Sequence, residues 1–135
     1  EPFKQWGEGH FVELASLLAA RGHGVLLLAG PAEAALAQAI LARVDAPLRA
    51  RVAAMTDGSV ADSVAALSLA QSCIGNDTGV VNMAAAVGTP TFVVLGPRPP
   101  LEHDPQTMRL VQAPSLQDIR AADVATRALR ELGID

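Results

Sequence analysis

The sequence predicts an α/β fold in which helices flank a parallel sheet, within a single domain over residues 1–135. Short apolar runs alternate along the chain with longer segments whose apolar residues recur at helical spacing. Glycine and proline turns separate these segments. Because strands that alternate with helices form right-handed strand–helix–strand units, this order indicates parallel pairing.

The first half of the chain contains the beginning of this alternation. Residues 8–21 place Phe11, Leu14 and Leu18 on one helical face, which predicts an amphipathic helix. The apolar run 25–29 ends at Gly30-Pro31 and predicts a strand that is buried on both faces. The pattern then repeats, with a helix, a weak strand and a second helix expected over 32–44, 51–55 and 59–71.

The second half continues in the same order. Ser59 and Asp62 have the spacing of a capping box, so we expect a helix to start there. A helix that follows the motif 76–79 should stop at Gly88 and Pro90. The remaining expected elements are strands over 72–75, 91–95 and 108–111, a helix over 78–87 and a closing helix over 121–132.

Composition excludes several functional classes. Half of the residues are hydrophobic, which predicts a folded chain. The net charge is −4 and there is no basic stripe, so we expect no nucleic-acid partner. No apolar stretch is long enough to span a membrane, and the first residues do not resemble a signal peptide. Cys73 is the single cysteine, expected to be an inert core residue in a reducing compartment.

The chemistry is expected at the carboxyl ends of the strands, where ligands bind in open α/β sheets. Asn76-Asp77-Thr78-Gly79 is the most informative of the turns at these ends, because it leaves a strand and opens a helix. Asp77 or Thr78 can cap that helix, and Gly79 lets a ligand approach the backbone. Free N–H groups and the helix dipole then predict a phosphate site.

Two other interpretations of this motif remain open. In the simplest interpretation, Asp77-Thr78-Gly79 only caps the helix and binds no ligand. It also matches the catalytic triplet of aspartic proteases, although that triplet belongs to a β-rich barrel and a helix is expected here. The sequence has neither a dinucleotide-binding glycine motif nor a P-loop, so these readings have no support.

Three segments, taken in order, resemble one known family. Residues 76–90 read Asn-Asp-Thr-Gly-Val-Val-Asn-Met-Ala-Ala-Ala-Val-Gly-Thr-Pro and lead into a strand that ends in Gly96-Pro97. Upstream, Lys4-Gln5-Trp6 precedes Phe11-Val12-Glu13-Leu14, and Gly30-Pro31-Ala32-Glu33 follows the first apolar strand. This combination resembles the bacterial ADP-heptose:lipopolysaccharide heptosyltransferases, which form glycosyltransferase family 9.

The resemblance implies a Rossmann-like domain, one half of a two-domain GT-B glycosyltransferase, and it covers only the C-terminal, donor-binding half. By this resemblance Lys4 would contact the diphosphate of a nucleotide-diphosphate sugar, and Glu33 would bind the ribose hydroxyls. Asp77, Thr78 and Gly79 would line the pyrophosphate and sugar site. A cation and a helix N-terminus are suited to bind two phosphates, and a carboxylate is suited to accept hydrogen bonds from the two hydroxyls of a diol.

The chain departs from the family pattern in two ways. Asn82 stands where the family has histidine, and asparagine donates a hydrogen bond but carries no charge near neutral pH. The family's catalytic carboxylate and acceptor site belong to an N-terminal domain outside this sequence, so we expect no catalytic residue here. The donor domain's first strand, expected just before Lys4, is also absent, and a sheet without it would expose an unpaired edge.

We therefore expect the chain to be the donor-binding domain of a heptosyltransferase-like enzyme of lipopolysaccharide or cell-surface glycan synthesis. On its own, the domain should be inactive. Its partners would be the donor and, through the other domain, a lipid-linked or oligosaccharide acceptor. We expect no cofactor and no metal, with Glu102-His103-Asp104 a solvated loop. The family places it in the cytoplasm, with the inner face of the membrane as a further location. A non-catalytic nucleotide-binding module and a purely structural domain are the alternatives.

Overall fold

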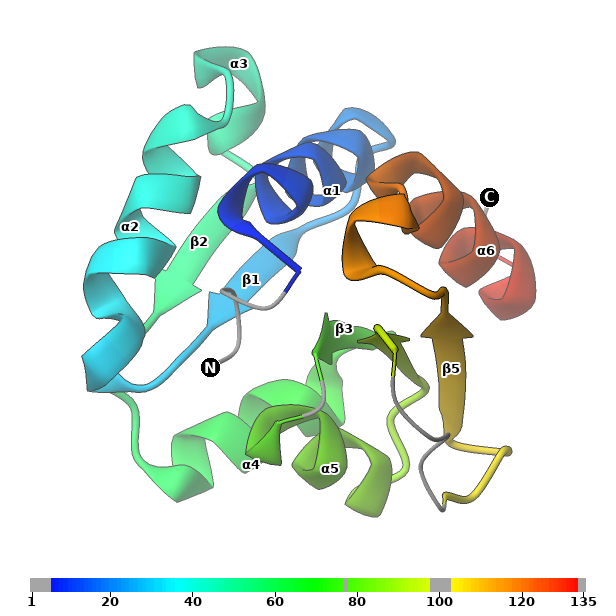
Figure 1. The fold of residues 1–135 in the computed structure, drawn as a ribbon. Helices are drawn as coiled ribbons and strands as arrows, with labels where there is room; N and C mark the ends of the chain where they lie inside the picture. Colours follow the sequence, from blue (N-terminus) through cyan, green and yellow to red (C-terminus); the bar gives the residue numbers. More distant parts are fainter. Residues whose placement is uncertain (1–5, 77, 98–102, 134–135) are drawn as a thin grey trace.

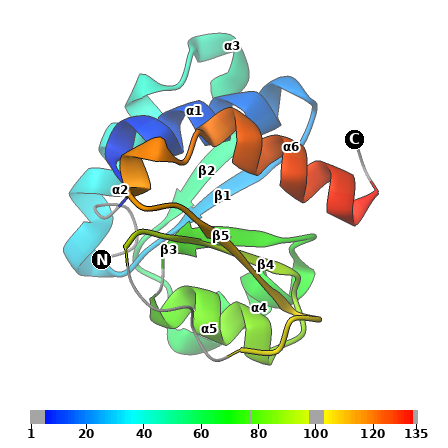
Figure 2. The same cartoon turned by 45° about the vertical axis from the view of Figure 1, so that its right-hand side comes forward.

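The computed structural model describes residues 6–76, 78–97 and 103–133, and it has the α/β architecture that the sequence predicts. The strands form a central layer (Figure 1). Helices α1, α2, α3 and α6 cover one face, here called the upper face, and α4 and α5 cover the lower face, as both ribbon views show (Figures 1 and 2).

The helices and strands follow one another in the expected order. The upper helices are α1 (Glu8–Ala20), α2 (Ala34–Arg43), α3 (Ala46–Arg49) and α6 (Ala121–Leu132), and the lower ones are α4 (Val60–Leu69) and α5 (Gly79–Ala86). The strands are β1 (Val25–Leu28), β2 (Val52–Met55), β3 (Cys73–Asn76), β4 (Thr91–Leu95) and β5 (Met108–Gln112). Two short 3-10 helices, Pro31–Glu33 and Leu116–Asp118, precede α2 and α6.

Local signals explain most of these boundaries. The Ser59 side chain accepts a hydrogen bond from the Asp62 N–H, and the Asp62 carboxylate accepts one from the Ser59 N–H. The capping box is therefore confirmed at the start of α4. Gly133 ends α6 in the left-handed region with φ 68°, a conformation that glycine adopts without strain. The short helix α3 was missed, because a single turn carries too few residues for a helical period.

The sheet differs from the single sheet that the sequence predicts. It is divided into a two-stranded sheet, β1-β2, and a three-stranded sheet, β3-β4-β5, with parallel pairing in both. The unpaired edge that the sequence predicts therefore lies inside the strand layer, between β1 and β3. The chain moves from β1 outward to β2, returns through α4 on the lower face to β3, and then moves outward again to β5 (Figure 1). Nothing among the described residues pairs with the inner edges of β1 and β3.

The core is divided by the strands into an upper and a lower cluster. The upper cluster gathers apolar residues of α1, α2 and α6 over β1, and it includes Trp6, Ile40, Val94 and Val124. The lower cluster contains Val81, Val93, Leu95 and Met108. Every position of β4 is buried, and alternate side chains of β4 enter opposite clusters.

Trp6 fixes the start of α1 to the other end of the chain. Its side chain is fully buried, and its indole Nε1 donates a hydrogen bond of 2.9 Å to the carbonyl oxygen of Ile119. His10 stacks on the indole at a centroid distance of 5.0 Å, and Phe11 meets it edge-on at 5.1 Å. Helices α1 and α6 pack together above these residues. The matched Lys-x-Trp segment thus has a structural role at Trp6.

The reactivity of the Cys73 thiol tests the environment of β3. Burial raises the pKa of the Cys73 thiol from 9.0 to about 12. Because only the thiolate reacts, the reactive fraction at pH 8 should fall from about one-tenth to about one ten-thousandth. We expect native chain to be alkylated by iodoacetamide roughly a thousandfold more slowly than chain in urea. Mass spectrometry at pH 8 measures both rates, and rates within tenfold of each other would contradict the raised pKa of Cys73.

Candidate functional site

The loops that could hold a ligand follow the carboxyl ends of the strands. The strands of both sheets run in the same general direction, so these ends share one edge, at the left in Figure 2. The loops after β1, β2 and β4 begin at Ala29, Thr56 and Gly96, and β3 ends at Asn76, shortly before Thr78. Strands β1, β2 and β3 are each followed by a helix N-terminus. This is the edge at which the sequence predicts the site.

Helix α5 opens directly from β3 at this edge. Thr78 is the N-cap residue with extended backbone, and Gly79 is the first helical residue, as predicted. The Thr78 hydroxyl makes no hydrogen bond to the helix backbone, so Thr78 does not form the side-chain cap, and a cap by Asp77 stays a prediction. Asp77 lies outside the described residues. Among the described residues, Thr78 thus gives the N–H groups of the first turn of α5 no acceptor, and first-turn N–H groups of this kind can bind an anion.

Gly79 is exposed to solvent, and no neighbouring atom requires a glycine at this position. A Cβ atom added at Gly79 would have nothing within 4 Å, and its backbone is not in the left-handed region. By contrast, a Cβ on Gly75 would lie 3.1 Å from Val81 Cγ1, and one on Gly96 would lie 3.1 Å from Leu116 Cγ. Glycine thus serves helix–strand packing at 75 and 96, while at 79 it leaves space for a ligand beside the backbone.

Asn82 lies one turn further along α5. Its amide Nδ2 donates a hydrogen bond of 2.9 Å to the Thr78 carbonyl oxygen, and the side chain is exposed. The contact ties Asn82 to the cap residue, so a change at 82 would be felt at the start of the helix.

Glu33 follows β1 at the same edge. It ends the 3-10 turn and is the N-cap residue of α2, with only 9 % of its surface exposed. The structure gives its carboxylate no hydrogen bond to another described residue, and its own N–H bonds to Gly30. A nearly buried carboxylate that has no hydrogen bond to another described residue suits a ligand that donates hydrogen bonds. Lys4 lies outside the described residues.

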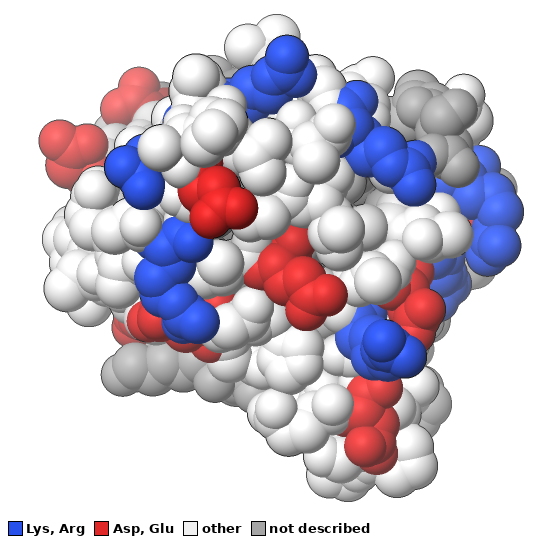
Figure 3. Space-filling view, turned by 90° about the horizontal axis from the view of Figure 1, so that it is seen from above, with Lys and Arg blue, Asp and Glu red and all other residues white. Residues whose placement is uncertain are grey.

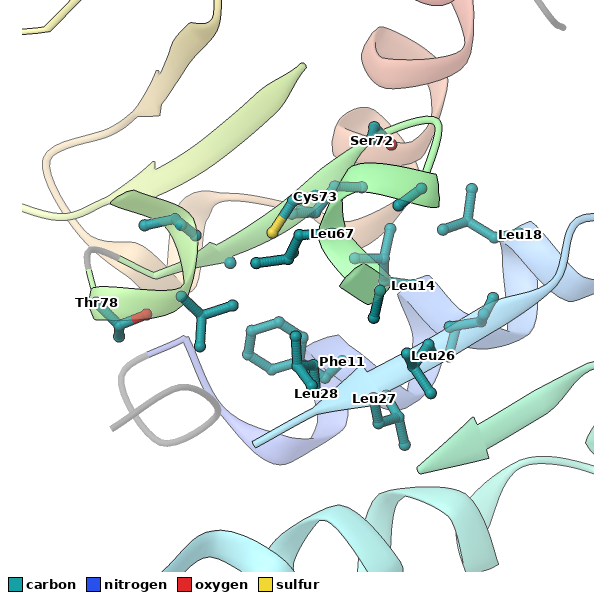
Figure 4. A pocket seen from close by; sticks show the side chains of 18 of the residues that line it. Phe11, Leu14, Leu18, Leu26, Leu27, Leu28, Leu67, Ser72, Cys73 and Thr78 are labelled. Atoms are coloured by element: carbon teal, nitrogen blue, oxygen red, sulfur yellow. The ribbon is translucent and has the colours of Figure 1, made fainter. Parts of the chain in front are cut away.

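An apolar groove of about 440 Å³ reaches this edge from below α1. Its walls come from α1, β1, α4, β3 and the start of α5, and Thr78 lies at one end while Leu18 and Ser72 lie at the other (Figure 4). Glu33 and Asn82 are not among its lining residues. Sequence reasoning missed the groove, because the apolar runs that line it predict strands covered on both sides.

Charge on the upper face gives no sign of a polyanion site. Positive and negative side chains alternate over this face (Figure 3). The ion pair between Arg43 and Glu8, at 2.6 Å, joins α2 to α1. Within the described ranges, no three His, Cys, Asp or Glu side chains are placed to hold a metal ion. No helix in this part of the chain is long and apolar enough to cross a membrane.

Comparison with known proteins excludes one of the interpretations of the motif. The sequence profile of glycosyltransferase family 9 (heptosyltransferase) matches residues 1–127. The chain belongs to glycosyltransferase family 9. This family 9 membership, with α5 following Thr78 directly, removes the aspartic-protease interpretation.

Curated relatives and solved structures agree with this assignment. Lipopolysaccharide heptosyltransferase 2 of Escherichia coli is 27 % identical over 130 residues, which cover 92 % of this chain and 37 % of the relative. Lipooligosaccharide heptosyltransferase 2 of Haemophilus influenzae is 26 % identical over 130 residues, covering 90 % of this chain and 37 % of the relative. The family 9 chain therefore spans little more than a third of these relatives.

Among solved structures, E. coli ADP-heptose lps heptosyltransferase II superposes with a TM-score of 0.83 at 25 % identity, covering 97 % of this chain and 42 % of that one. E. coli heptosyltransferase WaaC with ADP-2-deoxy-2-fluoro heptose superposes with a TM-score of 0.76 at 27 % identity, covering 95 % and 38 %. These two proteins have the α/β fold of the family 9 chain, with parallel sheets flanked by helices.

Proposed function

We propose that residues 1–135 form the donor-binding domain of a two-domain heptosyltransferase-like enzyme, and that the diphosphate of a nucleotide sugar binds at the N-terminus of α5. The observation that carries this is the open first turn of α5, where Thr78 leaves the N–H groups uncapped and Gly79 leaves space beside the backbone. An anion gains both hydrogen bonds and the helix dipole there.

The relatives supply the class of ligand. The WaaC structures are described as complexes with ADP and with a fluorinated ADP-heptose, and the family 9 chain superposes on both. By analogy, Glu33 would accept hydrogen bonds from the ribose hydroxyls, because its carboxylate is nearly buried and has no described partner. Lys4 and Asp77 remain proposed contacts to the diphosphate and sugar.

In the proposed reaction, a base from the other domain removes the proton of an acceptor hydroxyl, whose oxygen attacks the anomeric carbon of the donor. The bond from that carbon to the diphosphate breaks, and the diphosphate leaves with the electron pair. Lys4 and the amides of Gly79 and its neighbours would stabilise the negative charge on the leaving diphosphate. Asn82 would contribute a hydrogen-bonding amide without a charge.

The proposal is tested by calorimetric titration of the chain with ADP, UDP and GDP. We expect one diphosphate to bind selectively, and Glu33→Gln to weaken it about tenfold through the loss of charge-assisted hydrogen bonds. Gly79→Val should weaken binding by a similar factor or more, because its side chain would occupy the space beside the first turn. Circular dichroism should show both variants folded.

Matched variants away from the edge separate binding from folding. Glu13→Gln changes an exposed carboxylate on α1, and Gly24→Val changes a glycine that also has nothing within 4 Å but precedes β1 at the opposite edge. Neither should change affinity. Equal losses in Gly79→Val and Gly24→Val would contradict a site at α5. Binding that is selective but supports no transfer in the longer protein would favour the alternative, a non-catalytic nucleotide-binding module.

A further inference from the structure

We infer that Arg127 of α6 closes the outer edge of β5 and thereby keeps a second copy of this chain from pairing with that edge. Strand β5 ends the order β3-β4-β5, so its outer edge has no neighbouring strand among the described residues (Figure 1). An open edge can pair with the same edge of another copy, which is a route to association. The inference does not depend on the proposed nucleotide site.

The hydrogen bonds to β4 show which groups of β5 face outward. The Thr91 N–H bonds to the Thr107 carbonyl oxygen at 2.7 Å, and the Ala113 N–H bonds to the Leu95 carbonyl oxygen at 3.2 Å. The backbone groups of successive residues in a strand point to opposite sides, so the odd-numbered residues from 107 to 113 face β4. The even-numbered ones face the outer edge, and the backbone of Leu110 lies at its centre.

Arg127 covers the centre of this edge. Its guanidinium Nη1 donates a hydrogen bond of 3.0 Å to the Leu110 carbonyl oxygen, which a second strand would need as an acceptor. At one end of the edge, the Met108 N–H already bonds to the Asp104 carbonyl oxygen at 2.9 Å. Just beyond the other end, Pro114 has no N–H to donate. The centre and both ends of the edge are therefore restricted.

Further contacts hold Arg127 in this position. Its Nε donates a hydrogen bond of 2.7 Å to Oε2 of Glu131, one turn later on α6. Oε1 of Glu131 lies 3.5 Å from Nε of Arg109 on β5, and the Arg109 guanidinium lies over the Phe92 ring, 5.8 Å from its centroid. Because a guanidinium is planar and donates in fixed directions, the bond to Glu131 orients Nη1 toward the Leu110 carbonyl.

Charge adds a second barrier at this edge. Arg109 and Arg127 carry two positive charges against the single negative charge of Glu131, which leaves one net positive charge. Two copies that met edge to edge would bring these like charges together, and charged side chains on edge strands oppose association in this way. Without Arg127, the remaining pair is neutral and the Leu110 carbonyl is uncovered. Both barriers therefore depend on the same side chain.

The test compares three variants with the unchanged chain by sedimentation velocity over a range of concentrations. Arg127→Met keeps a long, helix-favouring side chain but removes the donor and the charge. We expect its dimer dissociation constant to be lower than that of the unchanged chain by about tenfold or more, since an acceptor is uncovered and a repelling charge is lost. Arg127→Lys, which keeps a donor and a charge, should behave as the unchanged chain. So should the matched control Arg130→Met, which removes an exposed arginine of the same helix.

Hydrogen exchange over 106–113, followed by mass spectrometry, locates the contact. In Arg127→Met this segment should exchange about tenfold more slowly in concentrated than in dilute samples, because the Leu110 N–H would bond to the second copy. Adding Leu110→Pro should abolish both the dimer and this protection, because proline removes an outward N–H and no bond to β4. Circular dichroism shows whether each variant is folded.

Three results would overturn the inference. The first is an Arg127→Met chain that associates no more than the unchanged chain. The second is equal association of Arg130→Met, which would be a general effect of lost charge. The third is association that leaves exchange over 106–113 unchanged, which would place the contact on another surface. All three come from single variants, so they decide the question even if the chain with Leu110→Pro does not fold.

Discussion

Replacement of Trp6 by alanine is expected to lower the free energy of unfolding by about 4 kcal/mol. Trp6 is fully buried in the upper cluster, where it contacts His10 and Phe11 and bonds to Ile119. Alanine would leave a cavity and an unpaired carbonyl group, so packing and hydrogen bonding are both lost. Urea denaturation followed by circular dichroism measures the change, which should shift the midpoint without altering the slope.

The variant Trp6→Phe separates these two contributions. Phenylalanine keeps an aromatic ring against His10 but removes the N–H donor, so we expect a loss of about 1–2 kcal/mol. If Trp6→Ala cost no more than Trp6→Phe, the indole ring would contribute little packing, and the position of Trp6 in the upper cluster would be wrong. A cost below about 1 kcal/mol for alanine would have the same meaning.

Replacement of Val93 by aspartate should be at least as damaging, with a loss of about 4 kcal/mol or more at pH 7. Val93 is fully buried in the lower cluster with Val81 of α5. A carboxylate there would be cut off from water and have no designed partner. Because Val81 lies in the first turn of α5, the substitution should also disturb the proposed phosphate site.

The matched control is Val60→Asp, since Val60 is the same residue type but 71 % exposed at the start of α4. An acid near a helix N-terminus is favourable, so this variant should be neutral or slightly more stable. For Val93→Asp the damage should be smaller at pH 4 than at pH 7, because burial favours the protonated carboxyl. Thermal melts at the two pH values check the sign, and equal stability of both variants would contradict the burial of β4.

Most of the fold was predictable because its signals are local. The apolar period of residues 8–21, the run at 91–95 and the Ser59–Asp62 spacing each indicate one element, and the structure confirms all of them. The break between β1 and β3 was not predictable as an internal groove. An apolar run shows that a strand prefers burial, but it does not show which neighbour provides that burial.

The elements that surround the candidate site were predictable, but the details of their side chains were not. The carboxyl edge and the start of α5 at Thr78 follow from strand order and turn sequence, and the structure confirms both. The lack of a cap from Thr78 and the bond from Asn82 to Thr78 depend on rotamers, which no spacing rule reveals. The roles of Lys4, Glu33, Asp77, Thr78, Gly79 and Asn82 in binding stay predictions.

The bond between Trp6 and Ile119 joins residues 113 positions apart, and α1 packs on α6 beside it. Residues near the two limits of the sequence therefore complete one helical layer. During synthesis on a ribosome, α1 would emerge long before its partner, with Trp6 and Phe11 still uncovered. Contacts so distant along the chain slow folding, so the upper layer should be the last part to become ordered. A nascent chain that stops before residue 119 should accordingly be held by chaperones and be sensitive to proteases.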